Sequence, residues 1–307
     1  MKRRLLTAAI AATALVLAGC GDGGNDEPAT APSANAAYPV TVGSVTLEAR
    51  PEKIVSLSPT ATEMLFAIGA GAQVTAVDDQ SNHPAEAPKS DLSGFKPNAE
   101  AIAAKDPDLV VVSNDTENIV AQLGKLAIPA FVAPAAATLD DTYKQIGELG
   151  TLTGHEAEAE QVNAGMAAKI DEIVKSAPAR TTPLSYFYEL GPELYSATSK
   201  TFVGSVFSRF GMTNVADAAD ASGSFGGYPQ LSQEAVVQAN PDTIFLADSK
   251  CCQQSAETVK ARKGWSAVTA VQKSQIFALD DDIASRWGPR TVDLVQAVAD
   301  ALNKIPA

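Results

Sequence analysis

Two separate stretches of the chain repeat one pattern. Residues 98–112 (NAEAIAAKDPDLVVV) and residues 232–246 (SQEAVVQANPDTIFL) each run from a short helical pattern through Pro-Asp into an apolar stretch. The matched positions are Glu100 with Glu234, Pro107 with Pro241, and Asp108 with Asp242. A helix-to-strand unit that occurs twice predicts two lobes of similar α/β architecture.

Strand and helix patterns alternate through the first half of the chain. Buried strands are predicted at 54–57, 73–77, 109–112 and 130–132, with helices at 59–68, 98–105 and 116–126. This alternation indicates crossovers in a parallel sheet. Residues 155–177 predict one long helix between the lobes, which would limit hinge motion. The expected fold class is α/β, with two Rossmann-like lobes bridged by that helix.

The first helix has two possible starts. Residues 60–63 (TATE) fit a capping box, whereas Ser58 followed by Pro59 is an equally good beginning. Both alternatives place a helix directly after the strand at 54–57, with Gly69 at its end.

The N-terminus is typical of a secretory signal. Three cations at positions 2–4 precede an apolar stretch over residues 5–18, too short for a helix spanning a ~30 Å hydrocarbon core. The motif LAGC at 17–20 resembles a bacterial lipobox, in which Cys20 is acylated and two acyl chains give stable anchoring. An ordinary signal with a chance cysteine is the alternative.

Composition then divides the chain. Residues 21–37 contain no bulky apolar side chain, which predicts a flexible tether. We expect a signal peptide (1–19), the lipidated cysteine and tether (20–37), an N-terminal lobe (38–153), a bridging helix (154–178) and a C-terminal lobe (179–307).

Charge and motif content exclude several function classes. Loss of the three signal cations takes the formal net charge from −13 to −16, which disfavours nucleic acid and anionic lipid as partners. No Gly-x-Ser-x-Gly or His-Glu-x-x-His motif is present, and the glycine-rich stretch 223–227 lacks the context of a phosphate loop. The chain has two histidines, His83 and His155, too few for a typical zinc site. We therefore expect a binding protein without catalysis, resident metal or cofactor, and His83 as a surface residue.

Three segments together resemble a known family. IVSLSPTATEMLFAIGAG from residue 54, Pro-Asn-x-Glu at 97–100 with PDLVVVS, and DDDIASRWGPR at 280–290 are similar to the Fe/cobalamin-type solute-binding proteins. The resemblance covers roughly residues 50–304 and is strongest to cobalamin-binding members that serve bacterial vitamin importers. It implies an extracytoplasmic, membrane-anchored and monomeric protein that binds a bulky metal chelate in a cleft between its lobes. The ligand would pass to the permease and ATPase subunits of an ABC importer.

The resemblance also assigns residues. Glu100 and Glu234, one on each lobe, are implied to dock onto arginines of the permease. A large flat chelate is held well by aromatic planes with a few polar contacts. The ligand candidates are Phe95, Tyr228, Asp282 and Arg286, with Trp287 and Tyr188 as weaker choices that could instead belong to the lobe cores.

The chain departs from the cobalamin-binding pattern at two positions. Gln80 and Ser113 stand where aromatic residues are expected. The departures also fit a relative that binds another corrinoid or a ferric siderophore. Among siderophores, an anionic catecholate would need more cations than Arg286, so a neutral to cationic hydroxamate is the alternative. A ligand-sensing lipoprotein without transport is a second alternative.

Two adjacent cysteines follow the strand predicted at 243–247. Outside the cytoplasm, Cys251 and Cys252 are expected to oxidise if geometry allows. A vicinal disulfide closes a strained eight-membered ring, so two free thiols or an intermolecular bridge are the alternatives. The hypothesis is a rigid cysteine pair at the rim of the cleft.

Overall fold

The structure, a computed structural model, describes residues 38–306, which lie within one compact unit from Ala34 to Ala307. The predicted signal peptide, Cys20 and the tether lie outside the described residues. No helix in the described part combines the length and the apolar character needed to cross a membrane. The predicted lobe boundaries near residues 153 and 178 stay a prediction.

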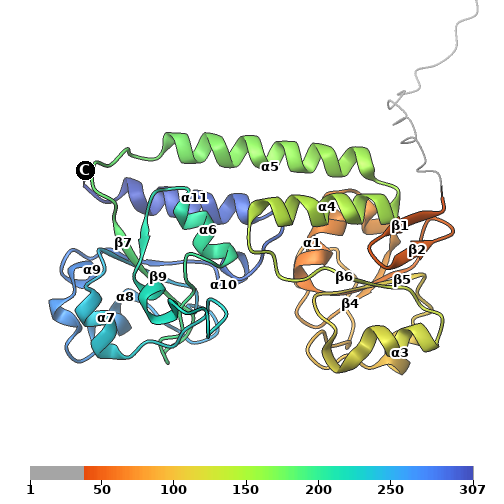
Figure 1. The fold of residues 1–307 in the computed structure, drawn as a ribbon, viewed down its shortest axis with the longest axis horizontal. Helices are drawn as coiled ribbons and strands as arrows, with labels where there is room; N and C mark the ends of the chain where they lie inside the picture. Colours follow the sequence, from red (N-terminus) through yellow and green to blue (C-terminus); the bar gives the residue numbers. More distant parts are fainter. Residues whose placement is uncertain (1–37, 307) are drawn as a thin grey trace, which may run out of the picture. The chain divides into compact units, whose positions relative to one another are not determined.

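A four-stranded parallel sheet in the order β4-β3-β5-β6 forms the N-terminal lobe. Strands β4, β5 and β6 are labelled in Figure 1. Its strands are β3 (Ile54–Leu57), β4 (Val74–Val77), β5 (Leu109–Val112) and β6 (Ala130–Val132). Its helices are α1 (Pro59–Ala67), α2 (Ala99–Ala103), α3 (Ile119–Lys125) and α4 (Leu139–Thr153), with 3-10 turns at Ala70–Gln73 and Thr116–Asn118. The predicted strands and helices are confirmed, apart from small shifts at their ends.

A short hairpin precedes this sheet. Strands β1 (Val40–Val42) and β2 (Val45–Leu47) pair antiparallel, and Val45 and Leu47 pack into the core of the N-terminal lobe.

The C-terminal lobe contains a second parallel sheet, in the order β10-β9-β7-β8. Its strands are β7 (Ser185–Glu189), β8 (Thr213–Asn214), β9 (Thr243–Leu246) and β10 (Ile276–Ala278). The helices are α6 (Phe202–Ser208), α7 (Gln233–Ala239), α8 (Ala256–Lys260), α9 (Thr269–Gln272), α10 (Asp281–Ala284) and α11 (Thr291–Asn303), with 3-10 turns at Val215–Asp220 and Trp265–Ala267.

The two sheets confirm the internal repeat. In each sheet the first strand in sequence lies between the second and the third, and the fourth lies at the edge. The matched aspartates have equivalent hydrogen bonds to the backbone. Asp108 accepts the backbone N–H groups of Glu52 at 2.8 Å and Lys53 at 2.9 Å. Asp242 accepts the N–H of Ser185 at 2.9 Å and its hydroxyl at 2.8 Å. Each aspartate therefore holds the segment that enters the neighbouring strand.

The first helix begins at the Ser58-Pro59 alternative. The Ser58 hydroxyl accepts the backbone N–H of Ala61 at 3.3 Å, and Pro59 takes the first helical position, where its missing N–H costs nothing. Gly69 follows the helix with a φ of +85°, which glycine adopts readily.

The predicted long helix is α5 (Glu156–Ser176), and it packs against α4 and α11 (Figure 1). Helix α4 was not among the predicted elements. Its signal was present in the sequence, because Thr138 and Asp141 form a capping box at its start. The bridging helix is thus supported along one side by a helix from each lobe.

The hydrophobic cores of the two lobes meet rather than remaining separate. Tyr143, Trp287 and Val292 pack against both the N-terminal and the C-terminal core clusters. These shared side chains tie the lobes together beside α5.

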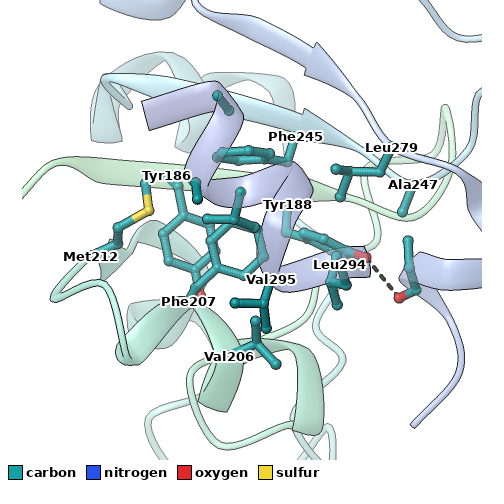
Figure 2. Packing of buried hydrophobic residues seen from close by; sticks show 14 of the residues in the cluster. Tyr186, Tyr188, Val206, Phe207, Met212, Phe245, Ala247, Leu279, Leu294 and Val295 are labelled. Atoms are coloured by element: carbon teal, nitrogen blue, oxygen red, sulfur yellow. Dashed lines mark hydrogen bonds between the residues drawn. The ribbon is translucent and has the colours of Figure 1, made fainter. Parts of the chain in front are cut away.

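Tyr188 lies inside the C-terminal core (Figure 2). It has no exposed surface, its ring lies 5.7 Å from that of Phe207, and its hydroxyl donates to the Ala284 carbonyl at 2.9 Å. The expectation of a ligand contact at Tyr188 is therefore wrong: strand β7 is covered on both faces, so its aromatic side chains fill the core.

Candidate functional site

Four aromatic side chains project into solvent near the carboxyl ends of the two sheets. The exposed fractions are 75% for Phe95, 46% for Tyr195, 58% for Phe225 and 49% for Tyr228. With Leu126, they are the exposed large apolar side chains of the described residues. Rings left in water forgo the stabilisation that burial gives, so such a group is typical of a binding surface.

The loop that carries Phe95 is fixed at the end of the N-terminal sheet. Residue Asp78, just after β4, pairs with Leu92, and Gly94 passes close to the last residue of β3. A Cβ at Gly94 would lie 2.7 Å from the Leu57 carbonyl oxygen, so only glycine permits this approach. Phe95 therefore stands beside the carboxyl end of the N-terminal sheet.

Two loops hold the aromatic residues of the C-terminal lobe. The segment after β7 and the segment before α7 are joined because the Ser196 N–H donates to the Pro229 carbonyl and the Leu231 N–H donates to the Leu194 carbonyl, each at 3.0 Å. Tyr195 lies on the first segment and Tyr228 on the second. Sequence reasoning identified Tyr228 but missed Tyr195 and Phe225. The signal for Phe225 was present in the sequence, because it lies between Ser224 and Gly226 in the glycine-rich stretch that favours a cleft loop.

A buried carboxylate shapes the loop of Phe225 and Tyr228. Asp220 is almost fully buried, and its side chain accepts the backbone N–H of Phe225 at 2.9 Å and that of Gly227 at 2.7 Å. The N–H of Phe225, followed by that of Gly227, holds the pKa of Asp220 below its usual range. Gly227 has a φ of +91° and no room for a Cβ beside Thr201. The loop is thus built around Asp220 and presents Phe225 outward.

Arg286 is engaged with protein groups rather than left free. Its side chain is 9% exposed and donates to Glu63 at 2.8 Å, Asn82 at 2.9 Å, and both the Gln80 carbonyl and Asp282 at 3.1 Å. Four hydrogen bonds leave little donor capacity for a ligand. The ligand role predicted for Arg286 stays a prediction, and in the structure its side chain connects α1 and the loop after β4 to Asp282.

The partner of Arg286, Glu63, was noticed in the sequence only as part of the possible capping box. Its carboxylate is 2% exposed and also accepts two bonds from Arg290, at 2.9 Å and 2.6 Å. A buried carboxylate on α1 of the N-terminal lobe therefore bridges two arginines that follow α10 in the C-terminal part of the chain.

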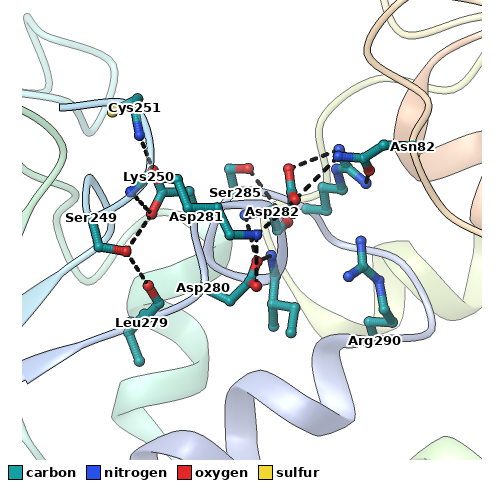
Figure 3. Close-up of polar contacts among 12 residues, drawn as sticks. Asn82, Ser249, Lys250, Cys251, Leu279, Asp280, Asp281, Asp282, Ser285 and Arg290 are labelled. Carbon is teal, nitrogen blue, oxygen red and sulfur yellow. Dashed lines mark hydrogen bonds and ion pairs between the residues drawn. The ribbon is translucent and has the colours of Figure 1, made fainter. Parts of the chain in front are cut away.

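Asp282 lies at the same junction and is partly exposed (Figure 3). It accepts bonds from Lys250 at 3.0 Å and from Asn82 at 3.2 Å. Burial alone would raise the pKa of Asp282, but the hydrogen bond from Lys250 and the charge of Arg286 hold it below its usual range. The DDDIASRWGPR segment thus meets the N-terminal lobe through paired charges.

Trp287 is half-buried at the meeting point of the two cores. Its indole N–H donates to Gln145 at 3.0 Å, and its carbonyl accepts from Thr142 at 2.9 Å. The core alternative therefore describes its surroundings better than a ligand contact does.

Glu100 and Glu234 occupy equivalent positions in the two lobes. Both are exposed, and each lies in the first turn of its helix, α2 or α7. The helix starts also match, since Asn98 accepts the N–H of Ala101 at 2.9 Å and Ser232 that of Ala235 at 3.1 Å. Each lobe thereby presents one carboxylate on a capped helix start.

Cys251 and Cys252 lie in the loop after β9, where Cys251 is exposed and Cys252 is half-buried. Both sulfurs are free in the structure, and the vicinal disulfide stays a prediction. His83 is exposed in its loop. Within the described residues, no three His, Cys, Asp or Glu side chains gather as a metal site.

Comparison with known proteins supports one family. Residues 54–283 match the family model described as periplasmic binding protein. An uncharacterized ABC transporter substrate-binding lipoprotein of Bacillus subtilis is 30% identical, covering 98% of this chain and 97% of its own length. A cobalamin-binding protein of Halobacterium salinarum is 28% identical over 84% of this chain and 71% of its own. The crystal structure of a vitamin B12-binding protein of Vibrio cholerae superposes with a TM-score of 0.68 at 26% identity, covering 82% of this chain and 97% of that one. The chain belongs to the periplasmic binding protein family.

Proposed function

We propose that this protein is the extracytoplasmic substrate-binding lipoprotein of an ABC importer and that its ligand is a bulky metal chelate, with a corrinoid favoured. The observation that carries the proposal is the group of exposed aromatic rings, Phe95 on one lobe and Tyr195, Phe225 and Tyr228 on the other. Rigid rings bind a large, partly apolar and flat ligand at low cost in side-chain entropy. The names of the relatives add support for this ligand class.

The paired charges favour a ligand without strong negative charge. Arg286, Arg290 and Lys250 form ion pairs with Glu63, Asp280 and Asp282, so the three cations of this cluster are balanced by three carboxylates. A triply anionic ferric catecholate would have to compete for these cations. A neutral corrinoid requires no such competition, and neither does a neutral or cationic ferric hydroxamate, which remains the second candidate because Gln80 and Ser113 replace expected aromatic residues.

Calorimetric titration of the unit from Ala34 to Ala307 with cyanocobalamin, cobinamide and a ferric hydroxamate tests the ligand. We expect a corrinoid to bind with a Kd of about 1 µM or tighter. Removal of the ring in Tyr228→Ala or Phe95→Ala should weaken binding about tenfold or more. Leu126→Ala, which removes an exposed apolar side chain elsewhere, is the matched control. Binding of the hydroxamate alone would move the protein to iron uptake, and binding of none of the three would contradict the ligand class.

The docking role of Glu100 and Glu234 rests on their equivalent, exposed positions. Two-fold related carboxylates fit a permease with two equivalent faces, and charge-assisted contacts to arginine give orientation with modest affinity. We therefore propose that these two side chains contact arginines of the membrane subunits.

Uptake of the bound chelate in cells tests this docking role. The double variant Glu100→Ala with Glu234→Ala should lose most uptake while its calorimetric affinity stays unchanged. Glu160→Ala, an exposed glutamate on α5, serves as the control and should transport normally. Unchanged uptake by the double variant would reject the docking role, and binding without any uptake by the wild type would favour a sensing lipoprotein.

The anchoring and assembly of the protein complete the proposal. The lipobox at Cys20 would attach the chain to the membrane by two acyl chains, and the monomer would diffuse between ligand and permease. Incorporation of labelled lipid into the wild type but not into Cys20→Ser would support this anchor.

A further inference from the structure

The loop after β9 carries two adjacent cysteines, Cys251 and Cys252. Figure 3 shows Cys251 in this loop beside Lys250 and Asp281. Cys251 is exposed, Cys252 is half-buried, and both thiols are free. A small oxidant can therefore reach the Cys251 thiol, and the second thiol is carried by the next residue in the chain.

One side of the loop is held by Asp281. Its carboxylate accepts the Ser249 hydroxyl at 2.8 Å, the Lys250 N–H at 3.0 Å and the Cys251 N–H at 2.9 Å. Burial alone would raise the pKa of Asp281, but the N–H groups of Cys251 and Lys250 hold it below its usual range. These three bonds couple the cysteine loop to the start of α10.

The other side of the loop is held by the Asp248 carbonyl. It accepts the N–H of Cys252 at 3.2 Å and that of Gln254 at 3.3 Å. The intervening Gln253 has a φ of +56°, an uncommon conformation for a residue with a side chain. The loop thus depends on the direction of the Cys252 N–H.

The loop also reaches the N-terminal lobe. The Lys250 ammonium contacts Asp280 at 2.7 Å and Asp282 at 3.0 Å, and Asp282 accepts the side-chain N–H of Asn82 at 3.2 Å. Oxidation of Cys251 and Cys252 can therefore affect the contact between Asp282 and Asn82 through Lys250, the residue next to Cys251.

We propose that Cys251 and Cys252 form a thiol–disulfide exchange site, and that its oxidation loosens this loop and weakens ligand binding. The co-reactant is a low-molecular-weight disulfide of the glutathione type. One cysteine thiolate attacks a sulfur of this disulfide and releases one small thiolate, and the second cysteine sulfur then displaces the other. The two cysteine protons pass to the two leaving thiolates, so the pair is oxidised by two electrons and the small disulfide is reduced by two.

Ring closure disturbs the loop because of where the ring lies. The backbone nitrogen of Cys252 is one of the eight ring atoms, so closure reorients the N–H that donates to Asp248. The Cys251 N–H to Asp281 bond lies directly beside the ring. Loss of one or both bonds weakens the hold on α10 and on Asp282, which contacts Asn82 across the junction.

The chemical step can be tested on the unit from Ala34 to Ala307 without any ligand. After treatment with glutathione disulfide, intact mass should show loss of two hydrogens and no alkylation by a thiol reagent. Hydrogen exchange should then become faster at the amides of Lys250, Cys251 and Cys252. Two alkylated thiols after treatment, or a disulfide with unchanged exchange at these amides, would overturn the proposal.

The effect on the ligand is a separate readout and rests on the proposed function. The oxidised wild type should bind cyanocobalamin about fivefold more weakly than the reduced protein, the size expected for loss of one or two hydrogen bonds. The double variant Cys251→Ser with Cys252→Ser should bind equally before and after the oxidant. If neither redox form binds a corrinoid, the proposed ligand fails while the exchange result still decides on the redox site. Equal affinity of the two forms would overturn the coupling to binding.

Discussion

Single buried carboxylates take several distinct roles in this molecule, and Asp248 is the least satisfied of them. It has no exposed surface, and no N–H or O–H donor among the described residues reaches its side chain. Glu189, also fully buried, lies close enough for its charge to act on Asp248, and it accepts Arg262 at 2.6 Å. Burial, and then the charge of Glu189, raise the pKa of Asp248 to about 7.

The substitution Asp248→Asn should therefore change how stability depends on pH. The carboxyl of Asp248 binds its proton more tightly in the folded than in the unfolded chain, so its contribution is full below pH 4 and is lost as pH rises through about 7. The amide of asparagine stays uncharged at every pH. We expect the stability advantage of the variant over wild type to grow from pH 4 to pH 7 and to reach on the order of 2 kcal/mol there, measured from urea midpoints. The same gain in the exposed control Asp91→Asn, or none in Asp248→Asn, would contradict this assignment.

At the scale of elements, the loop from Asp220 to Tyr228 shows how a small segment can present apolar rings. Its carboxylate lies inside and accepts backbone N–H groups, while the ring of Phe225 lies outside. The shape is thus set by the loop's own hydrogen bonds and not by packing of the aromatic side chains. This arrangement is preorganised for a ligand.

Loss of the internal carboxylate should weaken binding as much as loss of the ring does. Asp220→Ala removes the acceptor of the Phe225 and Gly227 N–H groups, so the loop becomes mobile. The loop must then become ordered when the ligand binds, and this loss of entropy lowers the binding affinity. Calorimetry should show affinity for the corrinoid reduced about tenfold in Asp220→Ala and in Phe225→Ala. The two losses should not add in the double variant, because they act on one contact. Additive losses, or none, would show that the loop does not position Phe225 on the ligand.

At the scale of the whole molecule, the lobes are joined at two places. Helix α5 packs against α4 and α11, and the segment around Trp287 packs against both cores. At this second place, Glu63 of α1 bridges Arg286 and Arg290 out of water. A second connection of this kind restrains the relative motion of the lobes more than a single helix would.

The substitution Glu63→Ala should show how much this connection contributes. It removes the carboxylate that both Arg286 and Arg290 contact. Removal of one partner of a buried ion pair lowers the free energy of unfolding by about 3 to 5 kcal/mol. Urea denaturation should report that loss, while Glu48→Ala, on the surface, should leave the midpoint unchanged. A midpoint for Glu63→Ala equal to that of wild type would mean that the bridge does not hold the lobes.

Most secondary structure was predictable because its causes are local. Ser58, Asn98 and Ser232 each cap a helix within three residues of their own position, and the buried strands are continuous apolar runs. The repeat added topology, since Asp108 and Asp242 mark the same strand of two sheets. Helix α4 was missed although its capping box is also local.

The site was predicted only in part. Phe95 and Tyr228 were identified from their loops, and Phe225 has a similar glycine-rich surrounding but was not selected. For Tyr188, a weak candidate with core as the alternative, the structure shows core, because both faces of β7 are covered.

The sequence by itself determined the repeated α/β pattern, the helix starts and the positions of the N-terminal strands along the chain, since these follow from hydrogen bonds and apolar periods within a few residues. Only the tertiary structure decided the partners of Arg286. Its guanidinium pairs with Glu63, 223 residues earlier in the chain, and that pairing exists only once both lobes have folded and met. Burial makes this pairing necessary, because a charge withdrawn from water is costly to the folded state unless an opposite charge and hydrogen bonds compensate it.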